Sequence, residues 1–354
     1  WSLGHVPTPS ENVLIDVPGL QTITVSSGEA SAYMLTSQEN FLISGGSLDL
    51  GGDSFFNEDL TLTGGLLGGA GDVMVLGDFN WSGGTLAGPG TFTTAGISTL
   101  MPSRRDLELQ RDWTNLGTIN WRGRNGRDLY IRDGYTLLNA NGGTLNLLTG
   151  SGSDIRGGGS LVNEGTVNKS GHKTISIKAR FSNAGTLNVY SGTLRLTYST
   201  GNDGVIQIGK HATLDLNGTS YSNRGLIYGN GTLDTRDVRF VNDGTIAPGS
   251  NGGAGIGTLT IKGDFRQSAS GVLQMNATGR KSGQYDELKV TGKAYLDGTL
   301  SLSAAGRYIP RTGDRFELIA YKSRSGTFDT LMGPNGFDLA PDYNWKSATF
   351  KLIP

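Results

Sequence analysis

Hydrophobic and polar residues alternate along most of this chain in short runs that are separated by glycine or asparagine. In residues 181–196, FSNAGTLNVYSGTLRL, Leu187 and Val189 alternate with polar neighbours, and Leu194 and Leu196 repeat the alternation after a turn. A period of two predicts β-strands of about four residues that turn one face toward a core. The pattern therefore predicts an all-β protein.

A motif made of a polar residue, any residue and a glycine recurs along the chain, and successive copies begin 19 to 33 residues apart. The second residue after the glycine is aliphatic in every copy, from Leu48 to Ile246. The copies begin at Ser44, Thr63, Ser82, Asn115, Asn141, Asn163, Asn183, Asn202, Asn223 and Asn242. A period near 20 residues with some longer steps is typical of a solenoid that carries loop insertions.

About three short strands fit into each period of roughly 20 residues, and together they make one coil. A single coil cannot bury its aliphatic side chains, whereas coils stacked in parallel bury a continuous column of them. We therefore predict a right-handed parallel β-helix with terminal caps, because an open solenoid end exposes strand edges. Residues 1–40 are assigned to an N-terminal cap and first strands, 41–305 to the coils, and 306–354 to a C-terminal β cap.

The asparagines that begin many copies of the motif fall at the corners of the coils. Stacked side-chain amides can form hydrogen bonds from one coil to the next, since each amide carries both donors and an acceptor. The corner position predicts a structural ladder of Asn115, Asn163, Asn183, Asn202, Asn223 and Asn242.

Composition excludes several classes of protein. The 57 glycines among 354 residues are roughly double the usual share, but regularly spaced aliphatics and a net charge of −1 argue against disorder. That charge also argues against a general nucleic-acid binder, which needs a basic face. The chain has no cysteine and no run of 18 apolar residues, so we expect neither disulfides nor a membrane-spanning helix.

Four stretches carry a resemblance to a known group of proteins. They are GDFNWSGGTLAGPGTF (77–92), FSNAGTLNVYSGTLRL (181–196), FVNDGTIAPGS (240–250) and GQYDELKVTGKAYLDGTLSLSAAGRYIPRTGDRFELI (283–319). With them the chain resembles the passenger regions of bacterial autotransporter and filamentous-haemagglutinin-like adhesins. The resemblance implies secretion or display on the bacterial outer cell surface, and a role in cell adhesion or as a scaffold.

The acidic residues offer one candidate for chemistry or cation binding. Asp215 and Asp234 lie about one period apart on outward strand positions, so neighbouring coils would place them roughly 5 Å from each other. Such a pair could bind a cation or supply the two carboxylates of a polysaccharide lyase or hydrolase. Neighbouring basic residues could equally neutralise both as ordinary surface acids.

Neither a metal site nor a cofactor is expected. The stretch GGAGD (68–72) matches a calcium-binding glycine repeat only weakly, because its Asp comes one residue early and the motif does not recur in tandem. His5, His172 and His211 show no ligand spacing.

The most distinctive chemical patch is residues 102–135, which hold seven arginines together with tryptophans and tyrosines. Aromatic rings stack on sugars, and the guanidinium fork matches carboxylates and sulfates. This combination predicts a glycan-binding strip formed by Trp121, Arg122, Arg124, Arg127 and Tyr130. The alternative is an exposed flank whose arginines pair with Asp106, Glu108, Asp112, Asp128 and Asp133.

Three functions remain open at this point. The leading hypothesis is a non-enzymatic, surface-exposed or secreted β-helix adhesin or stalk whose partners are polysaccharides or cell-surface glycans. The second is a polysaccharide lyase or hydrolase of the β-helix type that uses Asp215 and Asp234. The third is an extracellular matrix protein that associates with copies of itself.

Overall fold

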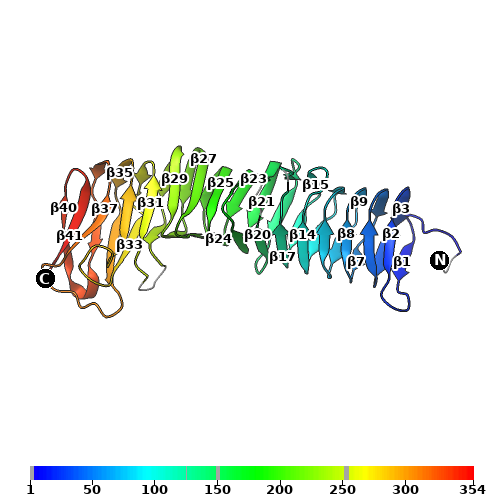
Figure 1. The fold of residues 1–354 in the computed structure, drawn as a ribbon, viewed down its shortest axis with the longest axis horizontal. Coiled ribbons are helices and arrows are strands. Elements are labelled where there is room, and N and C mark those ends of the chain that lie inside the picture. The colour runs from blue at the N-terminus through cyan, green and yellow to red at the C-terminus, as the bar shows by residue number, and fades with distance from the viewer. Residues whose placement is uncertain (1–3, 125, 149–151, 251–254) are drawn as a thin grey trace. The chain divides into compact units, whose positions relative to one another are not determined.

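The computed structural model describes residues 4–124, 126–148, 152–250 and 255–354. Over these residues the chain is all-β, and its parallel strands stack coil upon coil in a parallel β-helix (Figure 1). The fold predicted from the repeat is therefore confirmed. The chain divides into two compact units, Trp1–Phe181 and Ser182–Pro354, and each is described here by itself.

In the first unit, the strands form three columns. The first column contains β2 (Thr22–Val25), β5 (Asn40–Ile43), β8 (Leu60–Leu62), β11 (Phe79–Trp81), β14 (Ile97–Leu100), β17 (Thr118–Trp121), β20 (Thr144–Leu147) and β22 (Thr166–Lys169). The second contains β3 (Glu29–Ala32), β6 (Ser47–Leu50), β9 (Leu66–Gly68), β12 (Thr85–Ala87), β15 (Leu107–Gln110) and β18 (Leu129–Ile131). The third contains β1 (Asn12–Ile15), β4 (Met34–Ser37), β7 (Ser54–Phe56), β10 (Val73–Val75), β13 (Phe92–Thr94), β16 (Trp113–Asn115) and β19 (Thr136–Asn139).

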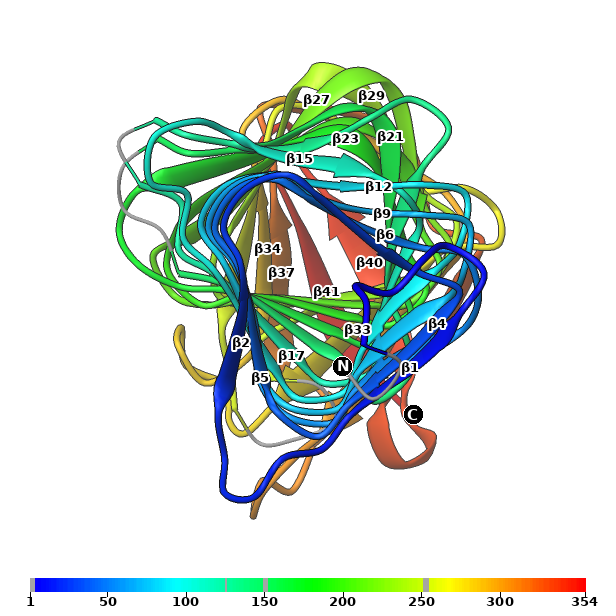
Figure 2. The same ribbon diagram turned by 90° about the vertical axis from the view of Figure 1, so that its right-hand side faces the viewer.

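The second and third columns then merge. The long strand β21 (Ile155–Asn163) pairs with β18 through Ile155 and with β19 through Ser160, and β23 (Thr174–Asn183) follows it along the chain. Viewed from the N-terminal end, the chain runs clockwise from β4 through β5 to β6 while receding from the viewer (Figure 2). The first unit is therefore a right-handed helix.

The register explains why the sequence repeats. Leu67 pairs with Leu48 of the preceding coil and with Leu86 of the following one, and all three side chains are buried. Stacking equivalent positions turns a sequence repeat into a continuous apolar column inside the coils. One layer of this core is aromatic, because Phe79 packs against Phe92 and Trp113 with ring centroids 4.9 and 5.7 Å apart.

The second unit begins with strands of the same pattern. One column contains β24 (Thr186–Val189), β26 (Val205–Ile208), β28 (Leu226–Gly229), β30 (Thr245–Pro248), β33 (Val272–Ala277), β36 (Thr299–Ala304) and β39 (Thr330–Met332). The facing strands are β25 (Gly192–Asn202), β27 (Ala212–Asn223), β29 (Thr232–Asn242), β31 (Thr258–Lys262), β34 (Glu287–Val290) and β37 (Arg315–Ala320). A small third sheet contains β32 (Phe265–Arg266), β35 (Lys293–Leu296) and β38 (Ser323–Gly326).

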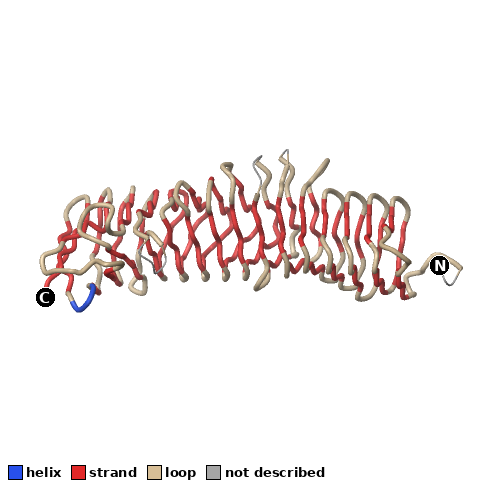
Figure 3. Tube along the Cα trace, turned by 60° about the horizontal axis from the view of Figure 1, so that its bottom comes forward, coloured by secondary structure: helices blue, strands red, loops and turns tan. Residues whose placement is uncertain are grey.

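The parallel pattern ends within residues 306–354. There β41 (Ser347–Ile353) pairs antiparallel with both β37 and β40 (Asp338–Tyr343), and a short 3-10 helix, η1 (Pro334–Gly336), precedes β40. Figure 3 shows how completely strands dominate both units, with η1 as the one helical segment drawn. Among the residues described, no helix has the length and apolar character needed to cross a bilayer.

Buried asparagines connect successive coils inside each unit. In the first unit, the Asn115 side-chain amide donates to Asn139 Oδ1 at 2.7 Å, and Asn139 donates to Asn163 Oδ1 at 2.8 Å. Asn139 was not selected by the repeat alignment, yet it forms the rung between the other two. In the second unit, the same donor-to-acceptor chain runs through Asn183, Asn202, Asn223 and Asn242, with distances of 2.7 to 2.8 Å.

Candidate functional site: an arginine-rich corner

Two loops of the first unit project from the same corner of the coils. Residues 101–106 connect β14 to β15, and residues 122–128 connect β17 to β18 one coil later. Their stacking follows from backbone hydrogen bonds, since Met101 N donates to Trp81 O and Arg122 N donates to Leu100 O, each at 2.9 Å. Earlier coils make this corner with tight glycine turns, such as Gly83–Gly84 between β11 and β12. The longest step of the repeat, from Ser82 to Asn115, only partly reflects the longer loop, because Ser82 follows β11 and Asn115 ends β16, so the two copies lie at different corners.

A groove of about 650 Å³ lies at this corner. The glycine pairs Gly64–Gly65 and Gly83–Gly84 line it together with Arg104, Arg105 and Arg127. The glycines stack so closely that a Cβ added to Gly83 would lie 2.5 Å from a backbone oxygen of the preceding coil. Because larger residues do not fit there, this part of the groove is bare backbone, open to an extended ligand.

The seven arginines of residues 102–135 fall into three groups. Arg111 is fully buried and donates to the carbonyl oxygens of Gly71 and Gly90 at 2.9 Å, and its burial lowers its pKa to about 10. Arg132 pairs with Glu108 at 2.8 Å. For the other five, no carboxylate of the described residues lies within ion-pairing distance; they are Arg104, Arg105, Arg122, Arg124 and Arg127.

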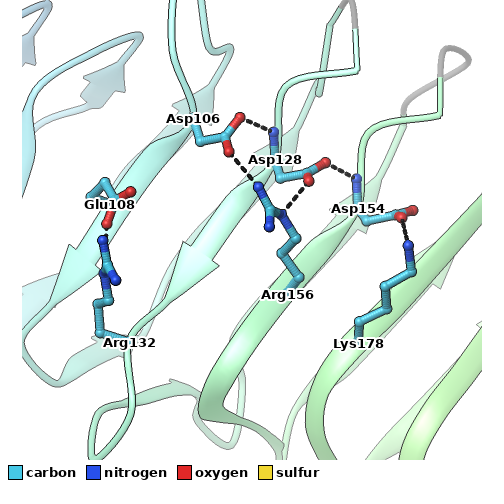
Figure 4. Close-up of polar contacts among 7 residues, drawn as sticks. All are labelled: Asp106, Glu108, Asp128, Arg132, Asp154, Arg156 and Lys178. Carbon is cyan, nitrogen blue, oxygen red and sulfur yellow. Dashed lines mark hydrogen bonds and ion pairs between the residues drawn. The ribbon is translucent and has the colours of Figure 1, made fainter.

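Two of the acids that could have neutralised these arginines, Asp106 and Asp128, are bound by a residue of a later coil (Figure 4). Arg156 of β21 donates to Asp106 Oδ2 at 2.7 Å and also contacts Asp128, and Lys178 of β23 pairs with Asp154 at 2.7 Å. The partial burial of Arg156 lowers its pKa, but its hydrogen bonds to the two carboxylates outweigh that effect and raise it overall.

The same carboxylates are held in place by the backbone of the next coil. Asp106 Oδ1 accepts a hydrogen bond from Asp128 N at 3.0 Å, and Asp128 Oδ1 accepts one from Asp154 N at 2.8 Å. Asp106 and Asp128 are therefore committed both to the backbone and to Arg156. The five remaining arginines keep their charge uncompensated at the corner.

The structure changes the strip that the sequence predicts. Trp121 is fully buried, so its assignment to a sugar-stacking surface is wrong. Its strand β17 alternates as TINW, and Trp121 faces the core with Ile119. Tyr130 is half-buried, and the guanidinium carbons of Arg132 and Arg156 lie 4.6 and 5.1 Å from its ring centroid.

The remaining three members of the strip are the arginines Arg122, Arg124 and Arg127, all of which are exposed. Only Arg127 lines the groove, where it joins Arg104 and Arg105. Arg104 and Arg105 do not belong to the predicted strip. Their signal was two consecutive arginines inside the longest interval of the repeat.

The second candidate, Asp215 and Asp234, lies in the second unit. The two residues are direct partners on β27 and β29. Each carries its own cation, since Asp215 pairs with Arg195 at 2.8 Å and Asp234 pairs with Arg236 at 2.7 Å. Burial raises the pKa of Asp234, but the hydrogen bonds from Arg236 outweigh it and lower the pKa overall. Both carboxylates are therefore held in ion pairs with arginines.

The GGAGD stretch is part of a turn between β9 and β10. Asp72 accepts a hydrogen bond from Thr91 N of the next coil at 2.6 Å, which gives its carboxylate a structural role at the corner. In the described part of the chain, no three His, Asp or Glu side chains converge as a metal site would require.

The chain was compared with known proteins. No family model matches it. It is 40% identical over 103 residues to the protein named adhesin BmaC autotransporter of Brucella suis biovar 1 (strain 1330). The chain resembles an autotransporter passenger in both sequence and fold. The match covers 27% of this chain and only 3% of that relative, so the chain is similar to a small part of a far longer relative.

Proposed function

We propose that this passenger is a non-enzymatic adhesin, secreted or displayed on the bacterial surface, that binds acidic glycans at the arginine-rich corner. The single observation that carries the proposal is the groove where Arg104, Arg105 and Arg127 meet. The two acids of its lining, Asp106 and Glu108, form ion pairs with Arg156 and Arg132 instead. A solenoid that repeats one coil supplies the scaffold, and function is expected where the repeat is interrupted by loops.

The chemistry of the groove favours a negatively charged and extended ligand. Guanidinium groups match carboxylate and sulfate oxygens in a two-pronged geometry, and each charged hydrogen bond contributes about 1.5–3 kcal/mol. Ser103 and Thr85 add hydroxyls to the lining, which can bind sugar hydroxyls. The bare glycine turns lie one coil apart, about 4.8 Å, so a linear chain can follow them without obstruction.

Ionic contacts, rather than ring stacking, are expected to dominate. Trp121 is buried and the ring of Tyr130 is in contact with two guanidinium groups, so neither offers a free aromatic face. Binding should therefore weaken as the salt concentration rises, because exposed charges are screened. A neutral polysaccharide of the same length should bind poorly.

The test is retention of the protein on immobilised heparin and polygalacturonate, with dextran as the neutral comparison. The variant Arg104→Gln/Arg105→Gln/Arg127→Gln should lose most of its retention on the acidic polymers. The matched control Lys289→Gln/Arg315→Gln/Lys322→Gln removes the same charge from exposed positions of the second unit and should be retained like the original protein.

Three results would overturn the proposal. The first is equal retention on dextran and on the acidic polymers, and the second is equal loss of retention in both triple variants. The third is release of new chain ends from an acidic polysaccharide, abolished by Asp215→Asn, which would show an enzyme instead of an adhesin.

A further inference from the structure

The second unit contains a separate basic pocket of about 430 Å³. It lies between the loop that follows β33 and the loop that joins β36 to β37. Three of its lining residues are arginines, and the full lining is Thr278, Arg280, Arg307, Tyr308, Ile309 and Arg311. None of these residues belongs to the arginine-rich corner.

A buried carboxylate fixes the shape of this pocket. The side chain of Asp314 is 3% exposed, and it accepts hydrogen bonds from Arg280 Nη1 at 3.3 Å, from the Tyr308 hydroxyl and from Arg311 N at 2.9 Å. Asp314 thus links both loops through one carboxylate. Its burial raises its pKa, but the hydrogen bonds from Tyr308 and Arg311 and the charge of Arg280 outweigh that and lower the pKa overall.

The carboxylate of Asp314 forms no ion pair with Arg307 or Arg311. Its two oxygens accept three hydrogen bonds, and its ion-pair partner is Arg280. Within the described residues, the exposed side chains of Arg307 and Arg311 have no carboxylate at ion-pairing distance. The pocket therefore holds three cations against one buried anion.

We infer that this pocket binds a compact oxyanion, namely a sulfate, phosphate or carboxylate group, between Arg307 and Arg311. Two guanidinium groups on one short loop offer donor pairs to such an anion, and Asp314 acts as a positioning residue that orders the loop. The exposed Ile309 lies between them along the chain and forms an apolar rim. The oxyanion can be free in solution or carried by a sugar.

The experiment measures thermal stabilisation of the whole chain by sodium sulfate and sodium phosphate, with ionic strength held constant by sodium chloride. A ligand that binds the folded state raises the melting temperature in a saturable way. A monosulfated disaccharide is the second probe. Tighter binding of the disaccharide than of sulfate identifies a sugar-borne group, and equal binding identifies the free oxyanion; each result supports the pocket.

The variant Arg307→Gln/Arg311→Gln should weaken the binding of sulfate by about tenfold or more. Arg307→Lys/Arg311→Lys keeps the charge and should retain part of the affinity, so a loss caused by misfolding is distinguishable. Lys289→Gln/Arg315→Gln removes equal charge from exposed strand positions nearby and should leave binding unchanged.

Two outcomes would overturn the inference: no saturable stabilisation by either oxyanion, or stabilisation that persists unchanged in Arg307→Gln/Arg311→Gln. Loss of sulfate binding in Arg104→Gln/Arg105→Gln/Arg127→Gln would also overturn it, because the anion would then occupy the corner of the first unit. Since the two sites use different residues, failure of one proposal is separable from failure of the other.

Discussion

Arg156 bridges Asp106 and Asp128, two carboxylates that belong to successive coils of the first unit. Asp106 directly precedes β15, Asp128 precedes β18, and Arg156 lies on β21, so one side chain ties three coils together (Figure 4). Asp106 also lines the groove at the arginine-rich corner. Because Arg156 neutralises Asp106, the groove keeps the positive charge of its arginines.

Replacing Arg156 with Gln should affect stability little and polyanion binding clearly. The side chain of Arg156 is 41% exposed, so we expect a loss of only about 1 kcal/mol in the free energy of unfolding. Asp106 would then carry an uncompensated charge into the groove and reduce retention on heparin at low salt. Lys178→Gln is the matched control, since it pairs with Asp154, which does not line the groove. Equal retention of the two variants would contradict this role.

The buried amide ladder predicts that a substitution of Asn202 lowers the free energy of unfolding much more than Arg156→Gln does. Its side chain donates to Asn223 Oδ1 at 2.8 Å and accepts from Asn183 at 2.7 Å, so Asn202→Ala removes one buried hydrogen bond on each side. We expect the free energy of unfolding to fall by about 2–4 kcal/mol. The loss can be measured by hydrogen exchange of residues 183–223 and by the melting temperature.

Asn217→Ala is the control, because Asn217 is a half-buried residue of β27 outside the ladder. Asn202→Asp gives a second comparison. A carboxylate at this position can accept but cannot donate, and it places a charge where the side chain is fully buried. This variant should be less stable than Asn202→Ala at neutral pH, and an equal or higher melting temperature would count against the ladder as described.

The fold could be predicted from the sequence because residues at equivalent positions of the repeat become direct partners in the sheet. Leu48, Leu67 and Leu86 recur at equal spacing in the chain and then pair directly in the sheet. Asn139 was missed for a related reason. The alignment counted a polar residue two places before a glycine, and in this coil the turn is longer, so the count fell on Asn141.

The candidate site could be predicted only in outline. The interrupted repeat indicated residues 102–135, but the partners of the arginines depend on which coils become neighbours. Arg156 binds Asp106 and Asp128 of the two preceding coils, and it lies outside residues 102–135. Trp121 was misassigned even though alternation with the inward-facing Ile119 already placed it in the core.

The burial of Trp121 gives a prediction that separates stability from binding. Trp121→Ala should lower the free energy of unfolding by about 3–5 kcal/mol, because it empties a large volume in the core. Trp121→Phe should fold and be retained on heparin like the original protein. Arg127→Ala should do the reverse, with an unchanged melting temperature and weaker retention, because Arg127 is exposed and lines the groove. A Trp121→Phe variant that folds normally but loses retention would restore the aromatic strip.

The carboxyl group of Asp286 predicts a pH dependence in the second unit. It is fully buried and accepts hydrogen bonds from Gly257 N at 2.9 Å and from Asn276 N at 2.8 Å. Burial raises its pKa from the ordinary 3.8 to about 6, although these hydrogen bonds oppose the shift. At a pH between 3.8 and about 6, the folded chain therefore binds more protons than the unfolded chain does.

Stability from this group should therefore be fully present below pH 4 and should decrease as the pH rises through 6. A shift of this size corresponds to about 3 kcal/mol over the whole pH range and to about 1 kcal/mol between pH 5 and pH 7. It should appear as slower hydrogen exchange around 257–290 at pH 5 than at pH 7 after correction for the intrinsic rate. Asp286→Asn should abolish this pH dependence. Asp264→Asn removes an exposed carboxylate that also accepts a backbone hydrogen bond, from Lys293 N at 2.8 Å, and should preserve the dependence. If Asp286→Asn showed the same pH profile as the original protein, the pH dependence would have to come from another group.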